Sequence, residues 1–297
     1  MLVLETFAHE TIWGGQKLVP YSNADVSRIG HLYSLCNEKG MESHILNGSY
    51  KGKTFHEFFC DNKDRYGLSE YDEFPLILAL VEAKDNLSIQ VHPGDDMAVS
   101  EEHAQYGKNE SWYFIEAPVS GCLYNGCNAK STEEVKEKLS SGHMMDVVGT
   151  LPVHNGDYVY VKAGTLHAMT SGSFVYEIEE NSPWTYRLYD YDRVDSQGNR
   201  RQLHIEKGLR ALDPFLKSES RQMPDDWIEE RRYRLLKLKN KTEYCNESRT
   251  LQCLTIIEGS CTAEGQKALT GTTIVLLPGE KIEGDFRLAM VAEPKKL

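Results

Sequence analysis

The segment LSIQVHP, residues 87–93, alternates apolar and polar side chains. Such alternation is typical of a β-strand with two different faces, and the polar face here carries Ser88, Gln90 and His92. A polar row of this kind usually faces solvent, but it can also line the inside of a barrel. Because amide oxygens and imidazole nitrogens bind metal ions, we interpret this strand as a candidate ligand-binding strand.

Two further candidate ligands, Glu110 and His167, lie on or beside other predicted strands, and Lys108 lies on the same side as Glu110. Antiparallel strands can bring these groups together with Gln90 and His92 inside a barrel. Two imidazoles, one carboxylate and one amide oxygen would then surround an ion. This donor set suits Zn(II) but also Fe(II) or Mn(II), so spacing alone leaves the metal open.

Strand signals dominate the elements that must position these residues. Short segments rich in β-branched and aromatic residues, separated by Gly, Pro, Asn or Asp, lie at residues 74–83, 111–117, 157–164, 173–180, 185–192, 251–259, 272–280 and 287–294. The pattern predicts a mainly β protein built as a jelly roll or barrel.

Helices are expected in only a few places. Residues 131–142 begin with an apparent capping box of Ser131 and Glu134, place Val135 and Leu139 on one face, and end at a glycine. Weaker helical patterns lie at residues 50–59 and 201–212.

An internal repeat predicts two modules. GDYVYVKAG at residues 156–164 matches GTTIVLLPG at 271–279, and an upstream strand motif recurs in the same order. We therefore expect two jelly-roll (cupin) modules, residues 1–212 with the small helical insertion and residues 213–297, joined by a polar segment that contains prolines. The second copy has Gln252 and Ile282 where the first has Glu110 and His167, so the metal site is expected in the first module only.

Composition limits the class of partner. The formal net charge is −12 with no extended basic cluster, so no nucleic-acid partner is expected. The longest apolar run, near residues 75–81, is far shorter than the ~20 residues that cross a bilayer, and no export signal is visible. Seven irregularly spaced cysteines predict no disulfide framework. We therefore expect a cytoplasmic protein without a membrane partner, while the oligomeric state stays open.

Four segments in order resemble the motif series of type I mannose-6-phosphate isomerases, at the spacing of their short bacterial forms. They are LSIQVHP, GKNESWYFIEA from residue 107, YVKAGTLHAM from residue 160 and EIEENSPWTYRLYDYDR from residue 177, and IWGGQKL at 12–18 is similar to the N-terminal signature of that family. The resemblance spans about residues 10 to 210.

The resemblance implies a cupin enzyme that interconverts mannose 6-phosphate and fructose 6-phosphate. It implies one zinc ion per chain, with Gln90, His92, Glu110 and His167 as its ligands. It also implies an active-site arginine, Arg187, and substrate or catalytic groups at Ser88, Lys108 and Glu177.

Aldose–ketose isomerisation moves a proton between C1 and C2 through an ene-diolate, so it needs a base and a cation near the developing charge. Arg187 and Lys108 are natural partners for phosphate or the ene-diolate, although spacing alone would pair Arg187 with Asp190 or Asp192 instead. The base stays open among Lys108, Glu177 and a water molecule on the metal.

Two positions depart from the family pattern. His31 and Pro183 stand where the family commonly has acidic residues, and slower turnover is therefore expected. A non-catalytic cupin that senses a sugar phosphate and a metal-dependent cupin oxygenase are the alternatives. Retention of Lys108, Glu177 and Arg187 favours the isomerase over the sensor, and the motif series makes the oxygenase the least expected.

Overall fold

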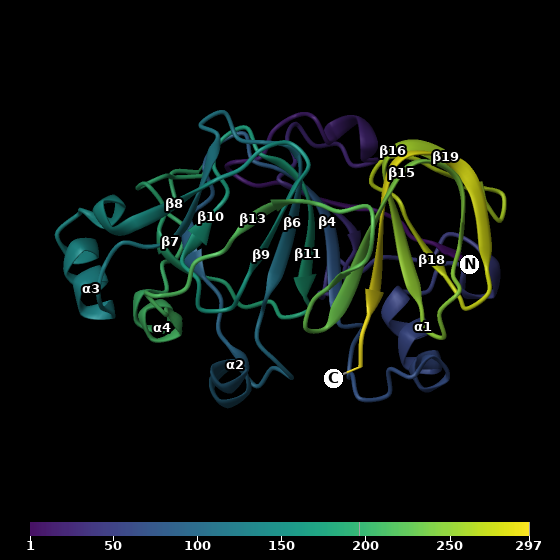
Figure 1. Ribbon diagram of the computed structural model, residues 1–297, viewed down its shortest axis with the longest axis horizontal. Helices are drawn as coiled ribbons and strands as arrows, with labels where there is room; N and C mark the ends of the chain where they lie inside the picture. Colours follow the sequence, from purple (N-terminus) through teal and green to yellow (C-terminus); the bar gives the residue numbers. More distant parts are fainter. Residues whose placement is uncertain (196, 297) are drawn as a thin grey trace.

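The protein is mainly β, as the sequence predicts. A computed structural model describes residues 1–195 and 197–296, and its strands form three antiparallel sheets with helices at the periphery (Figure 1). The predicted fold class, two jelly-roll (cupin) modules with a small helical insertion, is confirmed.

Two of the sheets belong to the N-terminal part and face each other. The first, which we call the site sheet, contains in spatial order β13 (Ser220–Gln222), β9 (Asp157–Val161), β6 (Glu110–Glu116), β11 (Phe174–Glu180), β4 (Leu76–Glu82), β3 (His31–Leu35) and β2 (Phe7–His9). The second, the facing sheet, contains β12 (Tyr186–Tyr189), β5 (Ile89–Val91), β10 (His167–Ala168), β7 (Cys122–Cys127) and β8 (Val148–Pro152).

An apolar core fills the space between these two sheets. Side chains such as Trp112, Phe114 and Val159 of the site sheet pack in one cluster with Ile89 and Leu188 of the facing sheet. Because side chains alternate along a strand, acidic residues that share this inner face are exceptions in an otherwise apolar surface. They are Glu110 on β6 and Glu177 and Glu179 on β11, each under 8% exposed.

The outer face of the site sheet packs against a third, C-terminal sheet. That sheet contains β1 (Leu2–Val3), β18 (Thr273–Leu276), β16 (Gln252–Ala263), β19 (Lys281–Pro294), β15 (Tyr233–Cys245) and β14 (Ile228–Glu229), with β17 (Gln266–Ala268) paired to β16. Tyr176 and Leu78 from the site sheet share a core with Met290 of this sheet. Strand β15 was not predicted, because charged and polar residues dominate its second half.

The division of the chain into two modules at residue 212 stays a prediction. Two short strands each pair with a strand from the other side of this division. Strand β1 pairs with β18, so the first residues of the chain lie in the C-terminal sheet, where Figure 1 places the N-terminus. Strand β13, from the segment predicted to link the modules, pairs with β9 of the site sheet.

The helices are α1 (Phe55–Asn62), α2 (Asp95–Glu102), α3 (Thr132–Ser140) and α4 (Ile205–Ala211), with 3₁₀ turns at Val19–Tyr21, Gly48–Tyr50, Lys63–Tyr66 and Met144–Val147. The three predicted helices are confirmed as α1, α3 and α4, whereas α2 was not predicted.

The predicted capping box of α3 is only half formed. Ser131 accepts the Glu134 N–H, but the Glu134 carboxylate accepts the N–H of Lys130 instead of Ser131. No helix in residues 1–195 or 197–296 combines the length and the apolar composition needed to span a membrane.

Candidate metal centre and active-site cleft

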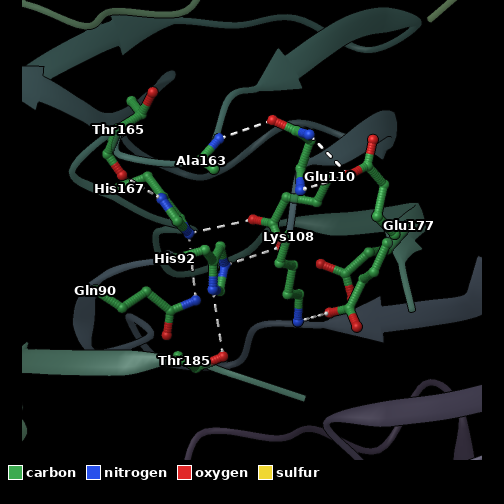
Figure 2. A network of polar contacts seen from close by, with 12 residues as sticks. Gln90, His92, Lys108, Glu110, Ala163, Thr165, His167, Glu177 and Thr185 are labelled. Carbon is green, nitrogen blue, oxygen red and sulfur yellow. Dashed lines mark hydrogen bonds and ion pairs between the residues drawn. The ribbon is translucent and has the colours of Figure 1, made fainter. Parts of the chain in front are cut away.

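Three predicted metal ligands converge at the inner face of the two N-terminal sheets. His92 follows β5, Glu110 begins β6 and His167 begins β10, and each is at most 2% exposed. Nε2 of His92 and Nε2 of His167 each lie 3.2 Å from a different oxygen of the Glu110 carboxylate (Figure 2). The three side chains therefore present ligand atoms toward one common point.

Hydrogen bonds on the far side of both imidazoles fit a metal site. Nδ1 of His92 donates to the carbonyl oxygen of Trp184 at 2.9 Å, and Nδ1 of His167 donates to that of Thr165 at 2.8 Å. A neutral imidazole bonded in this way keeps its lone pair on Nε2, and burial lowers the pKa of His92. The Nε2 lone pairs of the two histidines then face the oxygens of the Glu110 carboxylate. In the described part of the chain, Nε2 of His92 and Oε1 of Glu110 have no hydrogen-bond partner. A shared cation would satisfy both groups, so the residues fit a divalent metal.

Gln90 lies beside this cluster but presents a different atom than expected. It pairs with His167 across the facing sheet, and its Nε2 lies 3.3 Å from Nε2 of His167. Its Oε1 accepts a hydrogen bond from Ser88 at 3.4 Å. A metal ion would bind the amide oxygen, so ligation by Gln90 requires the side-chain amide to rotate and exchange the positions of its oxygen and nitrogen.

Lys108 forms an ion pair with a carboxylate that the sequence analysis missed. Its Nζ lies 2.8 Å from Oε1 of Glu179, and both side chains are almost fully buried. Burial by itself lowers the pKa of Lys108, but the neighbouring carboxylates of Glu179, Glu110 and Glu177 outweigh it and raise the pKa above its ordinary value. The raised pKa favours the ammonium form of Lys108, and its role as a base stays a prediction.

Glu177 is held by a tryptophan and faces a histidine. Oε1 of Glu177 accepts a hydrogen bond from the indole Nε1 of Trp112 at 2.8 Å, and Oε2 lies 3.4 Å from Nε2 of His31. His31, Glu177 and Glu179 form a second cluster of ligand-type side chains. Because Lys108 already supplies a cation to Glu179, this cluster contains its own charge compensation.

The cleft in front of these groups has a volume of about 350 Å³ and is positively charged on one side. Arg187, Arg201 and His204 line it together with Ser88, Gln90, Lys108 and Glu110. Asp190 pairs with Arg193 and Arg201, and Asp192 pairs with Arg200. Neither aspartate forms an ion pair with Arg187, so the surface-salt-bridge alternative for Arg187 is wrong.

Sequence reasoning missed several residues of the cleft for different reasons. Glu179 and Trp112 lie two residues from Glu177 and Glu110, so strand alternation could have placed them on the same face. Arg201 and His204 lie after an isolated β-bridge between Val194 and Arg200, and no local sequence pattern marks them.

In the second module, Ile282 is buried in an apolar core and Gln252 binds Glu293, both consistent with an N-terminal metal site only.

Comparisons with known proteins show which family the chain belongs to. Residues 1–112 match the family model described as phosphomannose isomerase type I, catalytic domain. A Bacillus subtilis (strain 168) protein named probable mannose-6-phosphate isomerase GmuF is 37% identical over 213 residues, which cover 71% of this chain and 68% of that protein. The chain belongs to the type I phosphomannose isomerase family.

Two more members of the type I phosphomannose isomerase family support the assignment. The mannose-6-phosphate isomerase of Streptococcus mutans is 35% identical over 213 residues, covering 71% of this chain and 67% of that protein. The crystal structure of the mannose 6-phosphate isomerase from Bacillus subtilis superposes with a TM-score of 0.84 at 29% identity, covering 98% of this chain and 99% of the other. The likeness to that structure therefore includes the C-terminal sheet.

Proposed function

We propose that the protein interconverts mannose 6-phosphate and fructose 6-phosphate through an ene-diolate. The observation that carries the proposal is one cleft whose wall contains Glu110 of the metal-type donor set, the buried carboxylate of Glu177 and two cations, Lys108 and Arg187. Ene-diolate chemistry needs a proton-transfer group and positive charge near the sugar oxygens, and this cleft contains both. Family membership supports the choice of substrate.

We further propose one zinc ion per chain, held by His92, Glu110 and His167. Gln90 is the fourth ligand after its side-chain amide has rotated. Two imidazoles and one carboxylate are a donor set that Zn²⁺ takes in catalytic sites. When bound, a divalent ion would lower the energy of negative charge that develops on the sugar oxygens.

The remaining residues have separate roles in this proposal. Arg187 and Arg201 lie on the same side of the cleft and bind the phosphate group, since a guanidinium matches phosphate with two parallel hydrogen bonds. Burial lowers the pKa of Arg187 and the neighbouring Arg201 lowers it further, so an anion between the two guanidinium groups would relieve their repulsion. The Lys108 ammonium offsets charge on the sugar oxygens, and Ser88 orients Gln90.

The test is a coupled isomerase assay in both directions, run with zinc-loaded protein and with protein stripped by a chelator. Binding of the same sugar phosphates is measured in parallel by calorimetry. We expect turnover that depends on metal and is lost in His92→Ala. Tight binding without turnover would favour the sensor, and the absence of both would contradict the assignment of substrate.

A further inference from the structure

His31 reaches Glu177 across an intervening strand. His31 lies on β3 and Glu177 on β11, with β4 between them, and Glu177 pairs with Ala79 of β4. Strands separated by one neighbour lie roughly 10 Å apart, which is farther than most side chains bridge. Nε2 of His31 nevertheless approaches Oε2 of Glu177 to 3.4 Å.

Neighbouring rings hold the imidazole of His31 in this orientation. The ring of Tyr33 stacks on it, with centroids 5.2 Å apart and planes inclined by 1°. Trp13 approaches its edge at 5.1 Å, and His9 stacks at 6.0 Å. The His31 side chain is 15% exposed and lines the cleft. A residue that served only as core packing would not need its ring nitrogen directed at a buried carboxylate.

Glu177 has one fixed oxygen and one free oxygen. Trp112 holds Oε1, whereas no hydrogen bond to Oε2 is present among the described residues. The nearest strong cation, Lys108, forms its ion pair with Glu179. His31 is therefore the group placed to interact with the free oxygen of Glu177.

We propose that Glu177 moves the proton between C1 and C2 of the sugar phosphate and that His31 is its positioning residue, which holds the carboxylate in its orientation toward the cleft. This inference rests on the proposed isomerase function and adds His31 to it.

The proton and electron count is complete without any further reagent. Oε2 of Glu177 takes the proton from C2 of the aldose, the C–H electron pair forms the C1–C2 double bond, and the carbonyl pair of C1 moves onto O1. Glu177 then returns the proton to C1, where the double-bond pair forms the new C–H bond. O1 gains a proton as the hydroxyl of O2 loses one, and C2 becomes the carbonyl carbon. His31 is unchanged over the cycle.

Several charged groups besides Glu177 surround His31 and are part of its electrostatic environment. Glu179 comes from the same strand as Glu177, Lys108 precedes β6, Glu38 follows β3 and His9 comes from β2. Burial raises the pKa of Glu38, with Glu179 raising it further. Each of these groups stays in place when only His31 is changed.

The experiment measures kcat and KM as a function of pH for zinc-loaded wild type, His31→Gln, Glu177→Gln and the double variant. We expect His31→Gln to lower kcat by about 10- to 100-fold with little change in KM, because the arginines bind the phosphate. The double variant should be no slower than Glu177→Gln, since two residues that act as a unit are not additive.

Two matched variants separate this role from a structural one. His143→Gln removes a histidine that faces Asp146 at 3.8 Å on the surface and should behave as wild type. His31→Lys places an ammonium group beside Glu177 and should retain more turnover than His31→Gln. Zinc content and circular dichroism are recorded for every variant.

The outcomes distinguish this inference from the proposed function. If the wild type is active, three results would each overturn the role of His31 and leave the proposed function intact. They are an unchanged kcat in His31→Gln, equal losses in His31→Gln and His31→Lys, and additive losses in the double variant. Absence of isomerisation by the zinc-loaded wild type would overturn the proposed function, and the role of His31 with it.

Discussion

Each of the three buried carboxylates in the cleft has a different charge partner. Glu179 faces the Lys108 ammonium, Glu177 faces His31, and Glu110 faces two imidazoles whose lone pairs point toward it. Burial of an unpaired carboxylate costs several kcal/mol, so each of the three needs a polar partner. Glu110 is the carboxylate that faces two imidazole Nε2 atoms at once, and this is why we assign the metal to Glu110.

Replacing one metal ligand should abolish metal binding. We expect protein purified without added metal to contain close to one zinc per chain, and His167→Ala to contain almost none, because the two remaining strong ligands, His92 and Glu110, cannot compete with water. Elemental analysis measures the content, and His154→Ala, at an exposed histidine, is the matched control. Undiminished zinc in His167→Ala would contradict the site, and two zinc ions per chain would contradict the expectation of a single site.

Arg187 should matter for turnover and little for folding. Arg187→Ala is expected to retain its zinc and its fold but to lose a hundredfold or more in kcat/KM, which corresponds to about 3 kcal/mol. Arg187→Lys should recover only part of this, since a point charge lacks the bidentate fork. Steady-state kinetics measures kcat and KM of these variants. Arg200→Ala, which removes an exposed ion pair, is the control. Unchanged kinetics in Arg187→Ala would remove this residue from the site.

At the scale of elements, the segment after β12 orients the cationic side of the cleft. Asp190 is 5% exposed and accepts hydrogen bonds from both Arg193 and Arg201. Burial by itself raises the pKa of Asp190, but these two guanidinium groups outweigh it and hold the pKa below its ordinary value of 3.8. The carboxylate thus fixes Arg201 beside Arg187.

Asp190 should stabilise the fold in a pH-dependent way. Because its pKa is lowered by folding, its contribution is fully present above the ordinary value of 3.8 and is lost as the pH falls through the lower folded-state value. Urea unfolding of wild type and Asp190→Asn should therefore differ at pH 7 and converge as the pH falls below 3.8. A difference in the free energy of unfolding that stays constant over this range would show that the pairing has no energetic effect.

At the scale of the whole molecule, a buried arginine connects the C-terminal part to the site. Arg232 is 2% exposed and donates to Glu180 at 2.7 Å and to Asp95 at 2.9 Å. Glu180 also accepts a hydrogen bond from the side chain of Asn109, the residue before the metal ligand Glu110, at 2.8 Å. The segment that leads into β6 is therefore held partly by a residue outside residues 1–212.

Removing this arginine should destabilise the protein strongly. Arg232→Ala leaves Glu180, which is fully buried, without its charge partner, and we expect a loss of about 3–5 kcal/mol in the free energy of unfolding. Arg231→Ala is the control, because Arg231 also pairs with Asp95 but is 59% exposed and should cost under about 1 kcal/mol. Chemical denaturation measures both. Similar losses in the two variants would contradict the role of the buried network.

The sequence alone predicted the features that depend on local pattern. Alternation in LSIQVHP placed Gln90 and His92 relative to the apolar residues, and the spacing of Val135 and Leu139 predicted α3. These succeed because side-chain direction within one strand or helix follows from its own period. The motif series identified the family for the same reason, since its segments are continuous in the chain.

Only the tertiary structure decided which groups meet across elements. The pairing of Lys108 with Glu179, the approach of His31 to Glu177 and the position of Arg201 all join residues that are far apart in the chain. The register between such strands depends on packing and on connections that no local pattern encodes. The sequence therefore determined which chemical groups are present on each strand, whereas the tertiary structure determined which charge compensates which, because compensation depends on distance in space.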